Sequence, residues 1–490
     1  MTTLLGIDQS TSATKAVLID SKGQLVDKVA RDHRQIYPQS GWVEHDANEI
    51  WQNMLAVVEE LAHRQPSLMD SIAGVAITNQ RETFVIFDRE TGLPLHNAIV
   101  WQCRRGDPIC RELAAHEPFV EQRTGLKLDT YFPASKIAWL IRERADIAAA
   151  IHSGQALIGT IDAYLVYRLT EGQVFATDHT NASRTLLYDV HNLRWDGQLC
   201  ELFGVPITAL PEVRDCSARF GQASAHGLLP ASVPICGVMG DSQASLFAQR
   251  CFEPGMAKAT FGTGTSVLMN VGGESAIRPG GSVLALAWVV GGKPTYALEG
   301  LINYSTATLT WLRDQLGLIS SADECESLAL EVPDNGGVYL VPAFAGLSAP
   351  HWKPEARAAI VGLTAHARKA HVVRAALESV SFQIGDVLDM MQRESSIVPQ
   401  VLHADGGPTC NRFLMQFTAD LIDRELRVTN TPELSVLGAA FAGMLGLGMY
   451  DSLAELADLP QETTTYQPRQ DADKVVGVRA GWHAAVNRVL

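Results

Sequence analysis

The sequence has little positive charge and no paired-cysteine motif. Its 39 lysine and arginine residues are outnumbered by 54 aspartate and glutamate residues, and its formal net charge is −15. This balance argues against a surface that binds nucleic acid or anionic membranes. The eight cysteines include no Cys-x-x-Cys pair. Their spacing therefore excludes the common zinc and disulfide frameworks and fits a protein of the reducing cytoplasm.

Long apolar segments and several catalytic motifs are also missing. The longest apolar run, residues 283–290, is too short to span a membrane, and the N-terminus lacks the basic region of a secretory signal. No Walker A, His-Glu-x-x-His, Gly-x-Ser-x-Gly or EF-hand pattern occurs. We therefore do not expect a P-loop NTPase, a zinc protease or an α/β-hydrolase. At 490 residues, the chain is long enough for two or more domains.

A stretch in the middle of the chain carries a candidate catalytic carboxylate. The apolar run at residues 233–239 predicts a buried strand, which ends in Gly240 and Asp241. The apolar residues at 244, 246 and 247 then fit a helix. Asp241 is thus expected between the end of a strand and the start of a helix, where open α/β sheets place their sites. An ordinary turn is the alternative for this stretch alone.

Two segments share the pattern of a strand, a turn rich in hydroxyl groups and a second strand. The first covers residues 4–20, with Gln-Ser-Thr-Ser-Ala-Thr-Lys at its turn; the second covers residues 256–269, with Gly-Thr-Gly-Thr-Ser. Backbone N–H groups in such turns can hold phosphate, although plain β-hairpins are the alternative. Two such segments, about half a chain apart, indicate an internal duplication and two similar α/β domains that face a cleft.

Further polar clusters follow apolar runs. Residues 79–83 follow a predicted strand at 72–78, and residues 98–105 end in a polar group next to Trp101. Each cluster is either ordinary surface or a site for a small polar ligand. The sequence also predicts helices at residues 300–314 and 370–392. An Asp-Gly-Gly turn at residues 405–407, before a helix from about residue 410, suits nucleotide binding, although an ordinary capped helix is the alternative. A Pro-Gly break within residues 252–255 marks the boundary between the halves.

Motifs along nearly the whole chain resemble those of the FGGY carbohydrate kinases, and of the glycerol kinases in that family in particular. Four matches in the first half are Gly-Trp-Val-Glu-His-Asp at 41–46, Ile-Thr-Asn-Gln-Arg-Glu-Thr at 77–83, Ala-Ile-Val-Trp-Gln-Cys-Arg-Arg at 98–105 and Thr-Asn-Ala-Ser-Arg-Thr at 180–185. Later matches include Tyr-Ala-Leu-Glu-Gly at 296–300, Val-Pro-Ala-Phe at 341–344 and Asp-Gly-Gly at 405–407. Both family signatures, at residues 131–143 and 362–378, are intact.

The resemblance implies an α/β fold of two actin-like (ribonuclease H-like) ATPase domains with an interdomain cleft. It assigns residues 1–252 to an N-terminal FGGY domain with the polyol site and the first phosphate hairpin. Residues 253–490 would form a C-terminal FGGY domain that binds the nucleotide. The implied reaction transfers the γ-phosphate of ATP, with Mg²⁺, to a terminal hydroxyl of a small polyol, as from glycerol to glycerol 3-phosphate. The resemblance also implies a homo-oligomer, either a dimer or a tetramer.

Matching motif positions imply roles for individual residues. Asp241 would be the general base that accepts the hydroxyl proton, and together with Asp8 it would hold Mg²⁺. The polyol positions correspond to Arg81, Glu82, Trp101 and Tyr131, with Asp241, Ser242 and Ser266 beside them. The nucleotide positions correspond to Thr11, Ser12 and Lys15 in the first hairpin, Gly262 and Thr263 in the second, and Thr306, Thr310, Gly407 and Asn411 further along the chain.

Several positions depart from the glycerol kinase pattern. Lys15 stands where these enzymes usually carry Arg, and Thr306 and Thr310 stand where they usually carry Gly and Gln. Ser242 and Ser266 replace a Gln and a bulky side chain, usually Phe. Two small hydroxyls in these places predict a larger and more polar pocket. The substrate is therefore either glycerol or a C4–C5 polyol or ketose, such as erythritol, threitol, erythrulose or xylulose.

A function of another class is also compatible with an actin-like fold. Such folds occur in filaments, chaperone ATPases and ligand sensors that phosphorylate no small molecule. The discriminating feature is the polar set of Arg81, Glu82, Trp101 and Tyr131 beside Asp241. A filament or chaperone has no need for this set, so the sequence favours the kinase.

Overall fold

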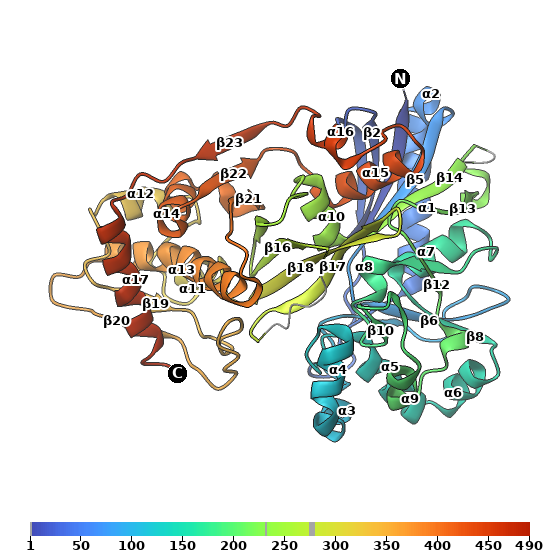
Figure 1. The fold of residues 1–490 in the computed structure, drawn as a ribbon, viewed down its shortest axis with the longest axis horizontal. Helices are drawn as coiled ribbons and strands as arrows, with labels where there is room; N and C mark the ends of the chain where they lie inside the picture. Colours follow the sequence, from blue (N-terminus) through green and yellow to red (C-terminus); the bar gives the residue numbers. More distant parts are fainter. Residues whose placement is uncertain (1, 231–232, 274–279) are drawn as a thin grey trace.

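Two β-sheets, one in each half of the chain, form the centre of the molecule (Figure 1). The computed structural model describes residues 2–230, 233–273 and 280–490. In Figure 1 the first half, blue to green, forms one lobe, and most of the second half, yellow to red, forms the other. Elements of both halves lie where the two lobes meet. A ligand bound at this junction would therefore contact both halves.

The sheet of the first half has six strands in the order β13-β14-β5-β1-β2-β3. Their bounds are β1 Thr3–Gln9, β2 Ala13–Asp20, β3 Leu25–Asp32, β5 Ile72–Asn79, β13 Arg219–Ala223 and β14 Val233–Gly240. β1 runs antiparallel to β2 and parallel to β5, and β5 runs parallel to β14. β1, β2 and β5 are almost fully buried, as expected for strands covered on both faces.

The sheet of the second half repeats this pattern in the order β17-β18-β16-β15-β21-β22-β23. Its strands are β15 Met256–Phe261, β16 Thr265–Gly272, β17 Val283–Val290, β18 Lys293–Ile302, β21 Val401–Asp405, β22 Glu425–Thr429 and β23 Thr463–Tyr466. β15 is antiparallel to β16 and parallel to β21, and β21 is parallel to β22. Since β15, β16, β18, β21 and β22 correspond to β1, β2, β3, β5 and β14, the predicted duplication is confirmed.

Helices cover both sheets. In the first half they are α1 Ala47–Arg64, α2 Pro66–Met69, α3 Asp107–Glu112, α4 Glu117–Thr124, α5 Pro133–Glu143, α6 Ala145–His152, α7 Ile161–Leu169, α8 His179–Ala182, α9 Gly197–Phe203 and α10 Asp241–Ala248. In the second half they are α11 Ala307–Asp314, α12 Glu324–Leu330, α13 Lys369–Ser395, α14 Arg412–Ile422, α15 Leu434–Gly446, α16 Leu453–Ala457 and α17 Ala472–Val486. None of the helices in the described part of the chain is long and apolar enough to cross a membrane.

Helices α10 and α15 pack against each other where the two sheets meet. Although α15 belongs to the second half of the sequence, it lies on β14, β5 and β1 of the first sheet. The two helices approach closely at Gly438, where a Cβ atom would lie 1.8 Å from the carbonyl oxygen of Ala244. Leu246, Phe247 and Phe441 belong to a core that also includes residues of both sheets. The two halves therefore share a hydrophobic core.

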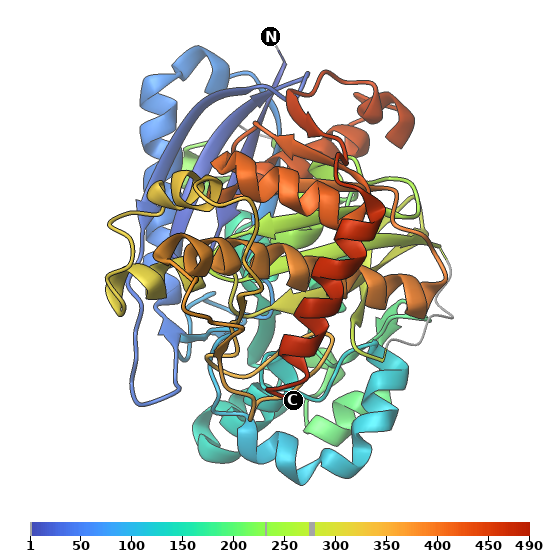
Figure 2. The same ribbon diagram turned by 90° about the vertical axis from the view of Figure 1, so that its left-hand side faces the viewer.

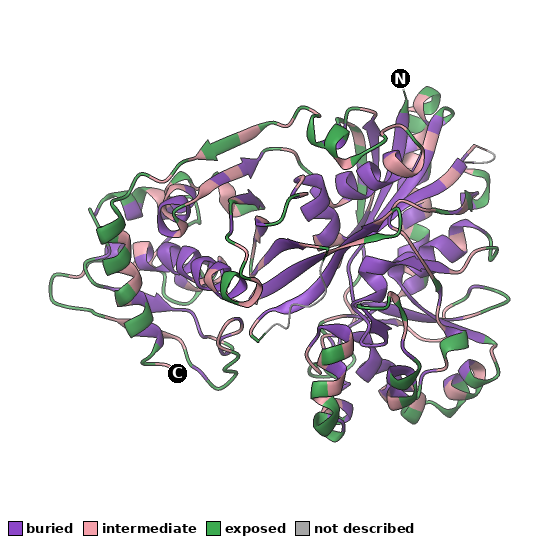
Figure 3. Cartoon of the chain, in the orientation of Figure 1, coloured by how far each residue is buried: buried purple, intermediate pink, exposed green. Residues whose placement is uncertain are grey.

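A smaller α/β unit lies beside the first sheet and carries α3 to α6 and α9 (teal in Figure 1). Its sheet has the order β4-β7-β6-β8, with β4 Glu44–His45, β6 Phe84–Asp88, β7 Ala98–Ile99 and β8 Ala156–Thr160. Figure 3 shows that buried residues line its interior and that exposed residues lie on its outer helices. Short pairs complete the strands: β9 Ala176–Asp178 with β12 Glu212–Arg214, β10 Tyr188–Asp189 with β11 Arg194–Trp195, and β19 Tyr339–Val341 with β20 Ala359–Val361.

The structure confirms most of the predicted elements and corrects one. The strand before Asp241, both hairpins and the helix at 370–392 are present. The helix predicted at residues 300–314 is wrong in its first part, because Gly300 belongs to β18 and pairs with Val267 of β16. The helix begins only at Ala307.

Figure 2 shows the C-terminal helix α17 on the outside of the second lobe, where Trp482 donates a hydrogen bond to Asp386 of α13.

Candidate active site

A cleft between the two halves brings most of the predicted site residues together. Its cavity has a volume of about 1070 Å³. The predicted residues that line it are Asp8, Thr11, Lys15, Arg81, Glu82, Trp101, Tyr131, Asp241, Ser242, Gly262, Thr263 and Ser266. The carboxyl ends of the parallel strands β1, β5 and β14 meet at this edge of the first sheet, and the β15–β16 hairpin faces them.

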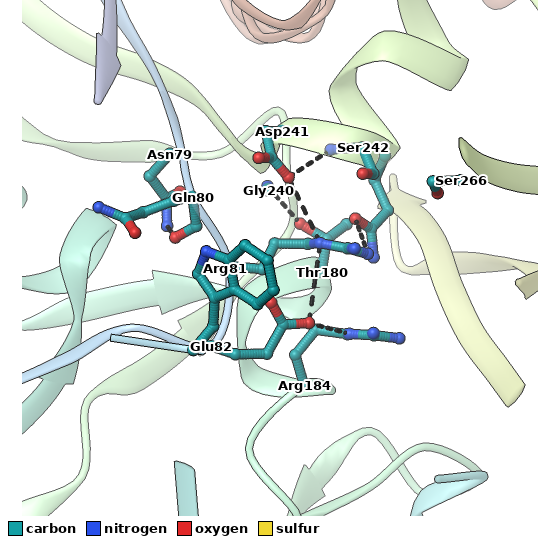
Figure 4. A network of polar contacts seen from close by, with 12 residues as sticks. Asn79, Gln80, Arg81, Glu82, Thr180, Arg184, Gly240, Asp241, Ser242 and Ser266 are labelled. Carbon is teal, nitrogen blue, oxygen red and sulfur yellow. Dashed lines mark hydrogen bonds and ion pairs between the residues drawn. The ribbon is translucent and has the colours of Figure 1, made fainter. Parts of the chain in front are cut away.

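Asp241 is the first residue of α10, directly after β14. One of its carboxylate oxygens, Oδ1, lies 3.4 Å from Nε of Arg81 and accepts a hydrogen bond of 2.7 Å from the backbone N–H of Ser242. The side chain is 37% exposed, so a ligand in the cleft can reach it. Figure 4 shows the line of contacts that runs from Asp241 through Arg81 and Glu82 to Arg184.

Behind Asp241, four charged side chains form what we call the buried cluster: Arg81, Glu82, Arg184 and Glu299. Arg81 donates to Glu299 at 2.9 Å, while Arg184 donates to Glu82 at 2.6 Å and lies 2.8 Å from Glu299. None of these side chains is more than 4% exposed. Burial opposes ionisation of Glu299, yet the guanidinium groups of Arg184 and Arg81 lower its pKa to about 2. The two positive and two negative charges thus compensate one another in a dry environment.

The turn after β5 presents Arg81 and Glu82 to the cleft. Glu82 adopts the left-handed backbone region, with φ 60°, which is uncommon for a residue other than glycine. The backbone N–H of Thr83 closes the turn by donating to the carbonyl oxygen of Arg81 at 2.7 Å. Such backbone strain is typical of sites that must aim particular side chains. Here it allows consecutive residues to line the same cavity.

Two aromatic side chains form one wall of the cleft. The ring centroids of Trp101 and Tyr131 are 5.3 Å apart. The buried ammonium of Lys136 donates to the carbonyl oxygens of Thr130, Tyr131 and Trp101 at 2.5, 3.0 and 3.5 Å, and burial lowers the pKa of Lys136 to about 8. Lys136 therefore fixes the backbone beneath both rings. Trp101 also donates from Nε1 to Thr11 Oγ1 at 3.1 Å, which connects this wall to the first hairpin.

A second group of charges lies beside the first hairpin and links the halves. In this lysine–carboxylate chain, Lys28 is 2.9 Å from Glu433, Glu433 is 2.6 Å from Lys15, and Lys15 is 3.1 Å from Asp8. Glu433 directly precedes α15, whereas the other three residues belong to the first sheet. Burial raises the pKa of Asp8 to about 6 in spite of the attraction of Lys15. Asp8 is thus a carboxylate whose charge the protein compensates incompletely.

The second hairpin borders another cavity, of about 540 Å³, which collects the remaining predicted nucleotide positions. Thr306, Thr310, Gly407 and Asn411 line it, together with apolar side chains such as Leu309 and Leu377. Thr306 donates from Oγ1 to the carbonyl oxygen of Gly262 at 2.8 Å, so this cavity lies next to the hairpin.

The Asp-Gly-Gly turn packs tightly on the second hairpin. Gly406 has φ 100°, and a Cβ atom there would lie 2.0 Å from the carbonyl oxygen of Phe261. A side chain at this position would therefore push the turn and the hairpin apart. The following helix α14 begins at Arg412, and the side chain of Asn411 caps it by accepting from the backbone N–H of Leu414 at 2.9 Å.

One predicted residue does not reach either cavity. Ser12 is exposed at the tip of the first hairpin, where its carbonyl oxygen accepts a hydrogen bond of 3.0 Å from the backbone N–H of His33. Arg184, Glu299 and Glu433 had no role predicted from the sequence. The signal for Glu299 was present, because a charge inside the buried, mostly apolar part of β18 requires a partner.

Comparisons with known proteins identify the family of this chain. The profile of the N-terminal domain of the FGGY family of carbohydrate kinases matches residues 3–248, and that of its C-terminal domain matches residues 257–447. The protein is thus an ATP-dependent kinase built on the two-domain, actin-like α/β fold. The chain belongs to the FGGY family of carbohydrate kinases.

Individual relatives cover the chain from end to end. It is 43% identical over 489 residues to a glycerol kinase of Desulfitobacterium hafniense, with 99% of each chain covered. It is 42% identical to glycerol kinase 2 of Thermotoga maritima, with 99% of this chain and 98% of the relative covered. The crystal structure of Plasmodium falciparum glycerol kinase with ADP is 35% identical, with a TM-score of 0.95 and coverage of 100% and 98%. The ligand-bound xylulose kinase of Lactobacillus acidophilus, at 20% identity, shares the fold with a TM-score of 0.90 and coverage of 100% and 98%.

Proposed function

We propose that this protein transfers the γ-phosphoryl group of ATP to a terminal hydroxyl of glycerol and forms glycerol 3-phosphate and ADP in the cytoplasm. The observation that carries the proposal is the position of Asp241, an accessible carboxylate between the buried cluster and the two hairpins. The similarity to proteins named glycerol kinase, at 42–43% identity over the full chain, supports glycerol as the acceptor.

In this reaction, Asp241 is the general base. As an oxygen of the acceptor attacks the γ-phosphorus, its proton passes to the Asp241 carboxylate and a new P–O bond forms. The bond between the γ-phosphorus and the bridging oxygen breaks, and its electron pair leaves with ADP. Ser242 N–H and Arg81 hold one carboxylate oxygen of Asp241, so the other is free to face the acceptor.

The polyol lies against the buried cluster and the aromatic wall. Arg81 donates to its hydroxyl oxygens and Glu82 accepts from its hydroxyl groups. Trp101 and Tyr131 cover its carbon chain. Because the cluster is charged and already paired, its groups are oriented before the substrate arrives, which lowers the cost of binding.

The nucleotide occupies the hairpins and the neighbouring cavity. Its phosphates meet the first hairpin, with Thr11, Ser12 and Lys15, and the second, with Gly262 and Thr263. Its nucleoside contacts the positions of the second cavity, Thr306, Thr310, Gly407 and Asn411. Ser12 lies at the exposed tip of the first hairpin, so its proposed role requires the hairpin to bend towards the phosphates.

The residues present fit a magnesium ion. Asp8 and Asp241 line the same cleft, and the incompletely compensated charge of Asp8 favours a cation beside it. No group of three or more metal-binding side chains occurs within the described residues, so phosphate oxygens and water would complete the coordination. When bound, Mg²⁺ neutralises charge on the phosphates. Asp8 and Asp241 would hold it beside those phosphates.

The proposal includes two functional domains, residues 1–252 for the polyol and the first hairpin and residues 253–490 for the nucleotide. Closure of these domains over the substrates would exclude water and limit hydrolysis of ATP. We also propose a homo-oligomer, a dimer or a tetramer, which sedimentation of the purified protein tests directly.

The decisive test replaces the base. We expect Asp241→Asn to lower kcat for glycerol by at least about 10²-fold, because the hydroxyl proton loses its acceptor. ADP affinity, measured by calorimetry without Mg²⁺, should stay near that of the wild type. Asp146→Asn, which changes an exposed carboxylate paired with Arg144 in the smaller α/β unit, is the control. Turnover by Asp241→Asn within tenfold of the wild type would contradict the assignment.

A second candidate function is phosphorylation of a C4–C5 polyol or ketose. The observation that favours it is the pair of small hydroxyl side chains in the cleft: Ser242 and Ser266 both line it, and Ser266 Oγ lies 3.3 Å from Glu299. These hydroxyls leave room for a longer chain with further hydroxyl groups. Comparison of kcat/KM for glycerol, tetritols and pentuloses decides between the candidates. A tenfold preference for glycerol over every longer substrate would exclude the second.

A further inference from the structure

Lys258 is a buried lysine on the wall of the cleft that the proposed mechanism does not use. It lies in β15, is only 1% exposed, and points along the strand towards Thr260, whose Oγ1 accepts from Nζ at 2.8 Å. Lys258 and Thr260 line the same cavity as Asp241. The hairpin turn at Gly262 begins two residues after Thr260. The ammonium therefore lies just below the second hairpin.

The ammonium of Lys258 is only partly satisfied by the protein. Within residues 2–230, 233–273 and 280–490, its one hydrogen-bond partner is Thr260, and no carboxylate oxygen lies within 4.0 Å of Nζ. Asp405, the strongest attractive charge acting on Lys258, is engaged elsewhere, because its Oδ2 accepts from Ser245 at 2.9 Å and from Gln249 at 2.5 Å. Two of the three ammonium N–H groups are thus left for another acceptor.

A second buried lysine shows how a purely structural ammonium is accommodated. Lys136 is equally buried, but three backbone carbonyl oxygens accept from it. A buried cation without acceptors is costly, so the open side of Lys258 favours an anion that enters from the cleft. In the proposed mechanism, the anionic group between the second hairpin and Asp241 is the γ-phosphoryl group.

We infer that Lys258 binds the phosphoryl group during its transfer from ATP to the acceptor hydroxyl. This inference rests on the proposed function, which it extends by one catalytic residue. As the bond to ADP breaks and the bond to the acceptor forms, negative charge spreads over the three equatorial phosphoryl oxygens. A fixed ammonium in a dry site stabilises that charge more strongly than it stabilises bound ADP.

The test compares a ligand that contains a phosphoryl mimic with one that lacks it. Calorimetry with the full chain, Mg²⁺ and glycerol measures binding of ADP alone and of ADP with beryllium fluoride, which occupies the γ-phosphoryl position. For Lys258→Met we expect ADP affinity close to that of the wild type and a loss of at least about tenfold in affinity for ADP–beryllium fluoride. kcat should fall by about 10²-fold. Lys293→Met removes an exposed lysine of the same sheet and is the matched control.

Two outcomes overturn the inference. If Lys258→Met loses affinity for both ligands equally, or keeps the wild-type kcat, Lys258 is only an internal counter-charge. Thermal unfolding alone does not decide, because a structural lysine would also lower stability; the difference between the two affinities does. If the methionine variant does not fold, Lys258→Gln, which is one atom shorter but keeps a neutral hydrogen-bond donor, provides the same comparison.

Failure of the proposed function gives a different result. If the wild type phosphorylates no polyol but its preference for ADP–beryllium fluoride over ADP still depends on Lys258, the polyol assignment is wrong and the phosphoryl site stands. If glycerol is phosphorylated at the same rate with and without Lys258, the function stands and the inference about Lys258 is wrong.

Discussion

The buried cluster and the lysine–carboxylate chain both connect the halves of the molecule through charge, but they do so in different surroundings. The cluster lies in a dry interior, and its side chains are at most 4% exposed. In the chain, Lys28 is 40% exposed and Lys15 is 24% exposed. Water and salt reach the two lysines and weaken their ion pairs, although the carboxylates of Asp8 and Glu433 are only 7% and 12% exposed; the cluster is protected throughout.

This difference suits what each group has to do. In the proposed mechanism the cluster presents Arg81 and Glu82 to a small uncharged substrate, so it must keep one geometry. Lys15 must instead turn from Asp8 and Glu433 towards the phosphates when the nucleotide binds. Ion pairs that are hydrated on the lysine side permit that exchange at a smaller cost than a dry network of four charges would.

The largest effect is expected when the buried cluster is broken. Glu299→Gln leaves two buried guanidinium groups opposite a single carboxylate, which should lower the free energy of unfolding by about 3–5 kcal/mol in denaturant titrations. KM for glycerol should rise, because Arg81 loses a partner that orients it. Glu112→Gln, in an exposed pair with Arg142, is the control and should match the wild type.

The stability of Glu299→Gln should also depend on pH differently from that of the wild type. The pKa of Glu299 in the folded protein, about 2, lies below its ordinary value of 4.5. Its contribution to stability is therefore complete above pH 4.5 and is lost as pH falls towards 2. The variant should lose less stability than the wild type over this interval. Equal losses would mean that Glu299 is not the group that stabilises the cluster.

A smaller effect is expected in the lysine–carboxylate chain. Glu433→Gln removes a negative charge next to Lys15, so the triphosphate should bind better and KM for ATP should fall by about two- to fivefold at low salt. Stability should change by less than about 1 kcal/mol. Steady-state kinetics between low and high salt check this, because the effect should shrink as salt rises. A higher KM would show instead that Glu433 is required to aim Lys15.

The smallest effect is expected at the outer end of the same chain. Lys28 is the most exposed residue of the lysine–carboxylate chain. Within that group of four residues, it contacts Glu433 alone. Lys28→Met should change KM for ATP by no more than about twofold and leave the unfolding midpoint unchanged. A loss comparable to that of Glu299→Gln would remove the distinction between the two groups.

Local sequence patterns were sufficient for the repeated strands and for the site residues at strand ends. Asp241 followed from an apolar run that ends in Gly240, and the hairpins followed from turns rich in small residues. These features depend on neighbours in the sequence, so periodicity and composition reveal them. The resemblance to a known family then supplied the roles of Arg81, Glu82, Trp101 and Tyr131.

Contacts between distant segments could not be predicted in this way. Arg81 meets Glu299 across 218 positions, and Lys15 meets Glu433 across 418. The error at residues 300–314 has the same origin, because Gly300 extends β18 only through its pairing with β16. Apolar residues at such positions satisfy the spacing of a helix as well as that of a buried strand, and only the partner strand decides.

The crossing of α10 and α15 makes the two halves unable to fold as separate modules. α15 is cut off from the first sheet if the chain is divided near residue 252, although its buried side chains, among them Leu434, Val436 and Phe441, have their partners there. The N-terminal fragment would then expose one face of its central strands, and the C-terminal fragment would carry an apolar helix without a surface to cover. The first sheet can therefore be completed only after synthesis has passed residue 446. Fragments that are expressed separately should be soluble only after they are combined.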